Sequence, residues 1–365
     1  MSGVQTLTVG PDEAEQRLDR WFRKQFPHVP QGRIEKLCRK GEIRVDGARA
    51  KSATRVGPGR VVRVPPLPEP DEGPPQPEQA RHGPSEGEAR EIRDAVIWRD
   101  DHMIVLNKPA GLAVQGGTGQ HRHLVAMLAA LRFGRSDDPR LVHRLDKDTS
   151  GLLVLARTGA AAVALTRLFR SRAVEKTYFA LVAGRPEPRA GTIRYGLAKG
   201  GGAGQEKMQI VHPDDLKDTP GAQAATTDYR VVEQAGRRVA WVALRPVTGR
   251  THQLRAHMAA IGCPVIGDGK YGGRGQENQG EGWGAGLGGA VSRKLHLHAA
   301  RLALPHPVTG AKLRFAAPLP EHMARSWDLL GLDPDAVPEP LFPPGGESAR
   351  RSRDAKGVAT NRGGS

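Results

Sequence analysis

A segment that cannot build a hydrophobic core divides the chain into a short and a long part. Residues 65–92 are rich in Pro, Gly and Glu and almost free of aliphatic side chains. This composition is typical of a semi-extended linker, because it offers too little apolar surface to offset the conformational entropy lost on folding. The sequences on either side must therefore fold as separate units, and 365 residues are enough for two cores.

A second stretch without apolar periodicity closes the chain. From residue 336 onward the sequence is too polar to pack, and it ends in RRSRDAKGVATNRGGS. We expect a mobile basic tail that adds affinity for a polyanion without adding specificity. The predicted organisation is a small unit at 13–64, a linker at 65–92, a large unit at 93–335 and a tail at 336–365.

The small unit reads as two helices followed by a small sheet. Apolar side chains at helical spacing predict a first helix that ends at Pro27 and a second that ends at Gly41. An alternating stretch over 43–45, a turn at 46–47 and a strand over 61–64 follow. The order is that of a compact α/β unit.

Basic side chains occupy the positions between the apolar ones of this unit. They are Arg17, Arg20, Arg23, Lys24, Arg33, Lys36, Arg39, Lys40 and Arg44. The whole chain carries 55 Lys and Arg against 39 Asp and Glu, and its net charge of +16 indicates a polyanionic partner. We interpret the basic helices as a surface for structured RNA; the alternative is a solvated helical face without a partner.

Hydropathy and cysteine content argue against several classes of protein. No apolar run approaches the roughly 18 residues of a membrane span, and the N-terminus lacks the features of a signal peptide. We therefore expect a cytoplasmic protein without membrane contact. Cys38 and Cys263 lie far apart and outside any C-x-x-C spacing, so we expect two reduced core thiols and no disulfide, structural zinc or iron–sulfur cluster.

The large unit alternates short aliphatic runs with long loops and few helices. Strands are predicted at 104–106, 152–156, 179–182, 229–232 and 239–244, and helices at 160–171 and 251–261. Dispersed helices among many strands favour an α+β domain on a mixed or antiparallel sheet. The Gly-rich stretches 196–204 and 272–289 are predicted to be loops, and neither has the context of a phosphate-binding loop, so we expect no nucleotide cofactor.

A charged loop precedes one of these strands. Residues 143–151 read His-Arg-Leu-Asp-Lys-Asp-Thr-Ser-Gly, directly before the apolar run 152–156. Positive neighbours favour the ionised form of Asp146, which could act as a nucleophile or a base without a metal. The other interpretation is an ordinary surface ion pair in a solvated turn.

The predicted helix at 251–261 follows a glycine-containing turn, Thr248-Gly249-Arg250. Thr251 is a natural N-cap, and Arg255 one turn further on can hold a carboxylate with its planar fork. A metal site is the competing interpretation, and its candidate ligands are His252, His257, Asp268, His296 and His298. The first two histidines are five residues apart instead of four, and no acid lies between them, so we expect no metal.

A third candidate is the tyrosine of the strand Glu175-Lys-Thr-Tyr-Phe-Ala-Leu-Val. Because side chains alternate along a strand, Tyr178 and Phe179 should face opposite ways. A strand tyrosine usually packs in a core. In an enzyme that acts on RNA, the exposed ring would offer a stacking platform for an unpaired base.

Together these stretches resemble the RluA-type pseudouridine synthases. The motifs that carry the resemblance occur in the family's order: NKPAG at 107–111, HRLDKDTSG, EKTYFALV, TGRTHQLRAH, GCPVIGD at 262–268 with Tyr271-Gly272, and LHA at 297–299. The resemblance covers about residues 95–320. LNKPAGLAVQGGTG is similar to the segment of the RluC-type subgroup, and the small unit resembles the S4 RNA-binding domain that several members carry.

The resemblance implies roles for individual residues. It makes Asp146 the essential carboxylate and Arg255 its partner, and gives Tyr178 a place stacked on the flipped base as a candidate for proton transfer at C5. Arg144 would displace the target uridine and fill its place. We also expect substrate or RNA contacts from seven more residues, namely His143, Arg250, Lys108, Arg33, Lys36, Arg39 and Lys40. No cofactor is needed, because the isomerisation involves no net redox change.

The leading hypothesis is an RNA-modifying isomerase that acts as a monomer on large-subunit ribosomal RNA. A non-catalytic S4-type ribosome-assembly factor is one alternative, and a metal hydrolase built on the histidines is another. A synthase with an RluD-like or transfer-RNA target is the third. Mapping of the modified uridines separates the targets, and activity that survives a chelator would eliminate the hydrolase.

Overall fold

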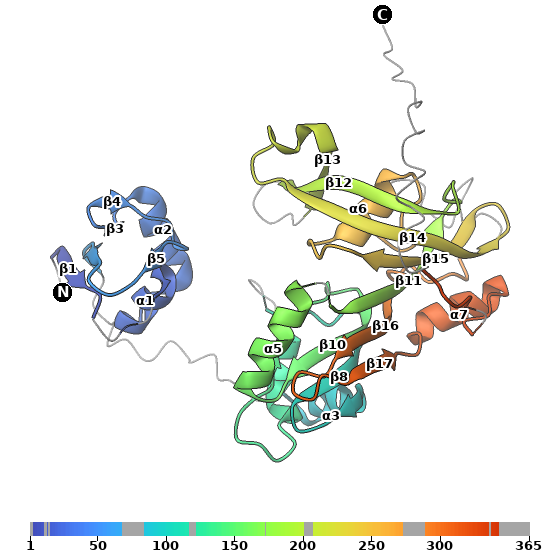
Figure 1. The fold of residues 1–365 in the computed structure, drawn as a ribbon, viewed down its shortest axis with the longest axis horizontal. Coiled ribbons are helices and arrows are strands. Elements are labelled where there is room, and N and C mark those ends of the chain that lie inside the picture. Colours follow the sequence, from blue (N-terminus) through green and yellow to red (C-terminus); the bar gives the residue numbers. More distant parts are fainter. Residues whose placement is uncertain are drawn as a thin grey trace, which may run out of the picture. The chain divides into compact units, whose positions relative to one another are not determined.

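The chain forms two compact units, Met1–Arg81 and His82–Ser365, which are described separately (Figure 1). The computed structural model describes residues 3–10, 13, 15–67, 84–116, 122–171, 173–200, 207–272, 289–335 and 337–342. Within these ranges every helix is too short or too polar to cross a lipid bilayer.

The small unit packs two helices against short strands. Its elements are β1 (Gln5–Thr8), β2 (Gln16–Arg17), α1 (Leu18–Gln25), α2 (Gln31–Lys40), β3 (Arg44–Val45), β4 (Ala48–Arg49), β5 (Arg55–Val56) and β6 (Val61–Val64). The predicted helices are present, and α2 ends at Gly41, whose positive φ of 73° closes the helix in the left-handed conformation. Trp21, Phe22 and Ile34 are almost completely buried in its core.

Strand β1 lies outside the range predicted for this unit. It precedes residue 13 and pairs with β6 in the antiparallel sheet of order β1-β6-β3-β4, Gln5 opposite Val64. Four residues, Gln-Thr-Leu-Thr, are too short and too polar to show a period of two, so only the pairing reveals the strand.

The large unit is an α+β domain on one mixed sheet. Its elements are α3 (Glu86–Asp94), β7 (Val96–Arg99), β8 (Met103–Lys108), α4 (Leu124–Met127), η1 (Leu128–Leu131), β9 (Arg140–Leu141), β10 (Ser150–Ala156), α5 (Gly159–Arg170), β11 (Glu175–Ala183), β12 (Ala190–Gly200), β13 (Lys207–Val211), η2 (Pro213–Leu216), β14 (Gln223–Ala235), β15 (Val239–Pro246), α6 (Gln253–Ala260), β16 (Leu297–Pro305), β17 (Lys312–Ala316) and α7 (Glu321–Leu330). The predicted fold class is confirmed.

The order of the strands places β10 and β11, which follow or contain two of the candidate motifs, on either side of β16. The sheet runs β13-β12-β14-β15-β11-β16-β10-β8-β7, with β17 on β16 and β9 on β10. Its named pairs are antiparallel except β10 with β16. Figure 1 shows α5 beside the half of the sheet that holds β8 and β10, and α6 beside the half that holds β12 to β15. Strands β11 and β16 join the halves.

Apolar side chains on both faces of the central strands form the core. Phe179 of β11 packs edge to face on Trp241, in a cluster that also contains Trp327. Tyr178, the preceding residue, contacts clusters on the other face. The alternation predicted for this strand is therefore confirmed. Cys38 and Cys263 are buried and free, as predicted.

Three predictions of irregular structure were wrong in part. Helix α3 begins inside the predicted linker and ends two residues beyond it: Ser85 and Glu88 form a capping box, and Ala89 and Ile92 are buried. Its charged composition hides this short apolar stripe. The predicted loop at 196–204 is strand up to Gly200, where β12 ends.

The predicted tail also begins too early. Val337 and Leu341 are buried in the core beside Trp327. Isolated apolar residues between prolines carry no period, so the sequence gives no signal that they pack. Residues 343–365 of the predicted tail and 273–288 of the predicted second loop lie outside the described residues.

Candidate active site

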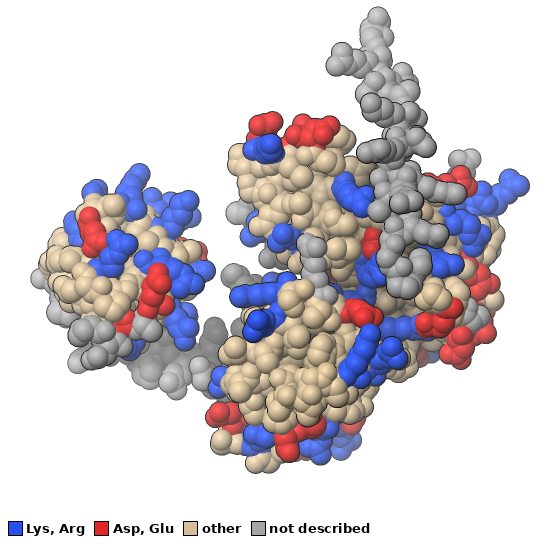
Figure 2. Space-filling view, in the orientation of Figure 1, with Lys and Arg blue, Asp and Glu red and all other residues tan. Residues whose placement is uncertain are grey.

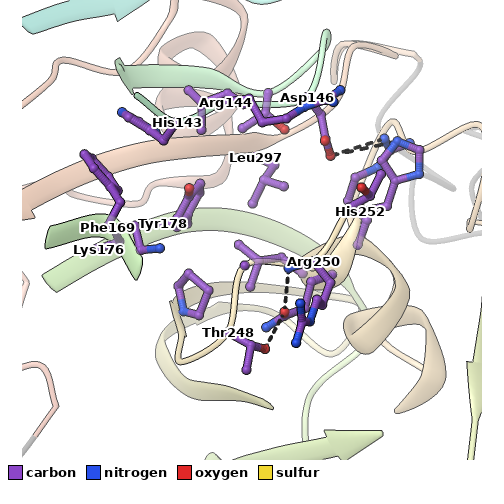
Figure 3. A pocket seen from close by; sticks show the side chains of 18 residues that line it. His143, Arg144, Asp146, Phe169, Lys176, Tyr178, Thr248, Arg250, His252 and Leu297 are labelled. Carbon is purple, nitrogen blue, oxygen red and sulfur yellow. Dashed lines mark hydrogen bonds and ion pairs between the residues drawn. The ribbon is translucent and has the colours of Figure 1, made fainter. Parts of the chain in front are cut away.

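A cavity of about 290 Å³ lies where the loop before β10, strand β11 and the start of α6 meet (Figure 3). Six side chains predicted to contact substrate from distant parts of the sequence line it, namely His143, Arg144, Asp146, Tyr178, Arg250 and Arg255. The fold therefore gathers the three separate motifs around one space.

Asp146 projects from the loop 143–149 into this cavity. Its side chain is 21% exposed, and its Oδ2 lies 3.8 Å from Nη1 of Arg255 and 4.0 Å from Nε2 of His252. Figure 3 shows the carboxylate directed toward His252. The carboxylate is accessible to a ligand and lies in the field of a guanidinium.

Lys108 links the loop 143–149 to the segment 109–112. Its Nζ donates to the carbonyl oxygens of Pro109, Leu112 and Lys147 at 2.8, 2.8 and 3.0 Å. The residue is completely buried, and burial lowers the pKa of its amine to about 7. The predicted RNA contact of Lys108 is therefore wrong, because the side chain is buried and its three hydrogen bonds go to backbone carbonyls that shape the loop.

The other end of the loop is fixed by close packing. Ser150 Oγ lies 2.8 Å from Nδ1 of buried His298. At Gly151, φ is 106° and a Cβ atom would lie 2.3 Å from the carbonyl oxygen of Ala299. Only glycine allows β10 to approach β16 this closely.

Arg255 has a stronger partner than Asp146. Its Nε and Nη2 donate to the two carboxylate oxygens of Asp268, both at 2.6 Å, and both side chains are buried. Burial disfavours the charged guanidinium, but the hydrogen bonds and charge of Asp268 raise the pKa of Arg255. The predicted pairing of Arg255 with Asp146 is present at 3.8 Å, as a looser contact made by the third nitrogen.

Helix α6 begins differently from the prediction. Thr251 is not its N-cap: the N-cap is His252, whose φ of 53° is left-handed. The turn is instead tied by Gln253, whose Oε1 accepts from the Thr248 hydroxyl and the Arg250 amide at 2.6 and 3.1 Å. A side chain inside the helix replaces the cap that Thr251 was expected to supply.

Tyr178 lies on the cavity wall at a bulge of β11. The register against β16 shifts between Thr177 and Tyr178, which turns the ring toward the cavity. Burial and the charge of Asp146 raise the pKa of the phenol, so it is neutral at physiological pH. A neutral half-buried ring suits stacking on a base.

His143 contributes an uncharged ring. It stacks on Phe169 with ring centres 4.0 Å apart, and its Nε2 accepts from the amide of Val154 at 2.8 Å. Burial and the charge of Lys176 lower its pKa to about 3. The ring of His143 is therefore uncharged at neutral pH.

Exposed basic side chains flank the cavity and cover helix α2. Arg144 and Arg250 are exposed at the cavity. The four residues predicted to bind RNA on α2 are also exposed, and they are Arg33, Lys36, Arg39 and Lys40. Figure 2 shows Lys and Arg side chains prominent on the visible face of the small unit.

The five candidate metal ligands do not converge. His257 Nδ1 bonds to the Thr227 hydroxyl, and His296 to Ser326 and the Lys294 carbonyl. Within the described ranges no group of three His, Cys, Asp or Glu side chains could hold a metal ion. The pattern of histidines is that of separately bonded core residues.

Sequence reasoning missed several residues of the site. Lys176 and Phe169 line the cavity, and so does Thr149, whose buried hydroxyl has no hydrogen-bond partner in the described part of the chain. Asp268 and Tyr271 do not line the cavity themselves but bond to Arg255 and His252, which do. Both lie in the segment GCPVIGD with its Tyr-Gly, so position in a motif was a signal, but nothing local to them predicts a partner 13 residues away.

Comparisons with known proteins agree with this geometry. Residues 102–260 match the family model for RNA pseudouridylate synthase, and residues 16–62 match the model for the S4 domain. The chain is 34% identical to ribosomal large subunit pseudouridine synthase C of Vibrio cholerae serotype O1 over 324 residues, 88% of this chain and 96% of the relative. The protein of that name from Escherichia coli strain K12 is 34% identical over 325 residues, 88% of this chain and 95% of its own.

A solved structure shares the fold of about two thirds of this chain. Human RNA pseudouridylate synthase domain containing 4 superposes with a TM-score of 0.56 at 31% sequence identity. The match covers 67% of this chain and 96% of the human chain.

Proposed function

The chain belongs to the RNA pseudouridylate synthase family, and we propose that it converts specific uridines of large-subunit ribosomal RNA into pseudouridine through Asp146. The named relatives support the substrate, since they are large-subunit synthases and align along most of their own length. The S4 match and the charge of +16 fit a structured, polyanionic substrate.

The reaction needs few chemical groups. The N1–C1′ bond breaks, the uracil turns, and C5 bonds to C1′; the hydrogen of C5 leaves as a proton and N1 gains one. Atoms and electrons balance within the nucleoside, so no oxidant, reductant or leaving group is required. A carboxylate, a platform for the base and a means of everting the uridine are sufficient.

Asp146 supplies the carboxylate. Attack on C1′ and removal of a proton from the ribose both require a negatively charged oxygen, and the guanidinium of Arg255 lies 3.8 Å from Oδ2 of Asp146. Asp268 fixes this guanidinium through two hydrogen bonds on the side away from Asp146. The observation that carries the proposal is therefore the accessible Asp146 carboxylate between Arg255 and His252, on the wall of a cavity that Tyr178 also lines.

Tyr178 and Arg144 serve the everted nucleotide. Unstacking a base costs a few kcal/mol, which aromatic stacking and an inserted side chain can offset. Tyr178 offers a neutral ring inside the cavity, and Arg144 an exposed guanidinium two residues before Asp146.

Mapping of pseudouridine in ribosomal RNA from cells lacking this protein tests the proposal. The expected result is loss of specific large-subunit pseudouridines, restored by the wild-type chain. An unchanged large-subunit map with a loss in transfer RNA would assign a different substrate. An unchanged map in both would leave RNA binding without catalysis.

A further inference from the structure

His252 and Tyr271, which have no assigned role, form a line of polar contacts that ends at Asp146. The amide of Met208 donates to the phenol oxygen of Tyr271 at 2.8 Å. That oxygen lies 3.0 Å from Nδ1 of His252, and Nε2 of His252 faces Oδ2 of Asp146 at 4.0 Å. Figure 3 shows the last of these contacts across the cavity wall.

The donors in this line determine where the imidazole hydrogen sits. An amide N–H can only donate, so the Tyr271 oxygen accepts from Met208 and its own hydrogen is available for Nδ1. The phenol hydrogen needs an acceptor, and among the described residues Nδ1 is the group within reach, which places the ring hydrogen on Nε2, toward Asp146. The opposite tautomer would leave the phenol hydrogen without an acceptor in the described residues and set the Nε2 lone pair against a carboxylate oxygen.

The surroundings hold His252 in this position. Its φ of 53° is disfavoured for any residue with a Cβ atom, and only Asp46 and Phe133 share a positive φ among the described non-glycine residues. The side chain is 7% exposed and packs edge to face on the Tyr271 ring. Such a conformation persists only where neighbouring contacts impose it.

We propose that His252 is a further catalytic residue, whose Nε2–H donates to the Asp146 carboxylate when substrate is bound, and that Tyr271 is the positioning residue that fixes its tautomer. This inference rests on the proposed function. The distance must shorten by about 1 Å, and catalytic hydrogen bonds commonly tighten on substrate binding. The donated hydrogen bond orients the carboxylate and directs its second oxygen into the cavity.

The arrangement also opposes protonation of His252. A proton on Nδ1 would displace the Tyr271 hydrogen and break the line. The charged or titratable groups that face the imidazole are Asp146, Arg255, Asp268, Lys270 and Tyr271. Burial lowers the pKa of His252; Asp146 raises it, and Arg255 and Lys270 lower it further. The ring is therefore neutral at neutral pH, and Nδ1 keeps the lone pair that accepts the Tyr271 hydrogen.

The Tyr271→Phe substitution removes one oxygen and tests the positioning role. We expect kcat on a large-subunit RNA fragment to fall about ten-fold while KM is unchanged, because an imidazole that carries its hydrogen on Nδ1 no longer donates to the charged Asp146 carboxylate. The acidic limb of the kcat profile should move to higher pH, because a freed Nδ1 takes up a proton more easily. Tyr195→Phe is the matched control, since the Tyr195 oxygen has no hydrogen bond among the described residues, and it should match wild type.

A second pair of variants tests His252 itself. The glutamine of His252→Gln can place an amide N–H at the position of Nε2, whereas the leucine of His252→Leu cannot. Both variants keep the disfavoured φ at this position, so backbone strain is the same in the two. The glutamine variant should retain at least ten times the turnover of the leucine variant, with equal RNA affinity. Equal losses in the two, or a Tyr271→Phe profile identical to that of Tyr195→Phe, would overturn the inference.

A measurement independent of activity separates this inference from the proposed function. NMR of isotope-labelled histidine should find His252 in the wild-type enzyme as the Nε2–H tautomer, and as a mixture in Tyr271→Phe. An Nδ1–H tautomer in the wild type overturns the inference even if Tyr271→Phe does not fold. A wild-type enzyme without turnover on ribosomal RNA refutes the proposed function instead.

Discussion

Arg255 and Asp268 form a buried ion pair with two hydrogen bonds of 2.6 Å, and Asp268 does not line the cavity. The pair fixes the plane of the guanidinium, so that its remaining nitrogen faces Asp146 at 3.8 Å. A carboxylate outside the substrate site thus sets the direction of the positive charge beside the reacting one. Asp268 also accepts from the amides of Lys270 and Tyr271, which ties the same pair to the loop behind the wall.

Asp268→Asn should therefore reduce both stability and turnover. Breaking a buried pair costs about 3–5 kcal/mol, and a guanidinium released from its fork no longer holds a fixed position. Asp228→Asn is the matched control, because Asp228 accepts two hydrogen bonds from Arg245 away from the cavity. Chemical unfolding and single-turnover kinetics should show a stability loss in both variants but a loss of the chemical rate only in Asp268→Asn. Equal chemical rates in the two would contradict the role given to Asp268.

Asp146→Asn should abolish pseudouridine formation and leave RNA affinity within about two-fold, since the amide keeps the shape but cannot act as nucleophile or base. Asp148→Asn, an exposed carboxylate on the same loop, is the control for a change of charge and should retain turnover. Filter binding and a tritium-release assay measure the two quantities. Residual turnover in Asp146→Asn would show that another group reacts.

Gly151→Ala should disrupt the loop that carries Asp146. The added Cβ would meet the Ala299 carbonyl at 2.3 Å, so both overpacking and a disfavoured φ contribute a destabilisation of roughly 3 kcal/mol. Gly134→Ala is the control: its φ is 84°, but nothing lies within 4 Å of the new atom. That variant should lose only about 1 kcal/mol and retain turnover. Thermal unfolding and turnover of the pair would distinguish backbone strain from contact with β16; equal behaviour would refute the contact.

The sequence could predict what depends on local pattern or on an ordered set of motifs. Strands such as β8 and β10 are long aliphatic runs, and Asp146, Tyr178 and Arg255 stand in motifs whose order identifies the family. What it could not predict depends on contacts between distant segments. From the sequence Lys108 is expected to be an exposed cation, whereas in the fold three backbone carbonyls surround its Nζ.

The same reason explains the errors at the start of α6 and at the chain's end. Thr251 has the chemistry of an N-cap, but the hydrogen bonds of Gln253 to Thr248 and Arg250 decide the turn. Leu341 shows no period, and its burial follows from a surface that strands of another segment provide. In both cases the deciding partner is set by the three-dimensional fold.

Buried histidines should make the large unit sensitive to mild acid. Burial lowers the pKa of His257, His296 and His298 to about 4, from an ordinary value of 6.5. The unfolded chain takes up these protons and the folded chain does not, so stability is full above pH 6.5 and falls as the pH drops toward 4. Three such groups give a slope of roughly 4 kcal/mol per pH unit in that window.

His257→Asn provides the test of this slope. An asparagine amide can replace the contact of Nδ1 with Thr227 but cannot titrate. Urea unfolding across the window should show a slope smaller by about 1.4 kcal/mol per pH unit than that of the wild type. An unchanged slope would mean that His257 is protonated in the folded chain.

Helix α2 should contribute phosphate contacts and not chemistry. Arg33, Lys36 and Arg39 are exposed on it, so replacing all three with Gln should raise KM and leave the chemical rate unchanged at saturating RNA. The slope of log affinity against log salt should become shallower by about 2–3, because each lost contact releases one fewer counterion. Glu35→Gln on the same helix is the control and should leave that slope unchanged. If the triple variant keeps the wild-type slope, the substrate is bound without this face of the small unit.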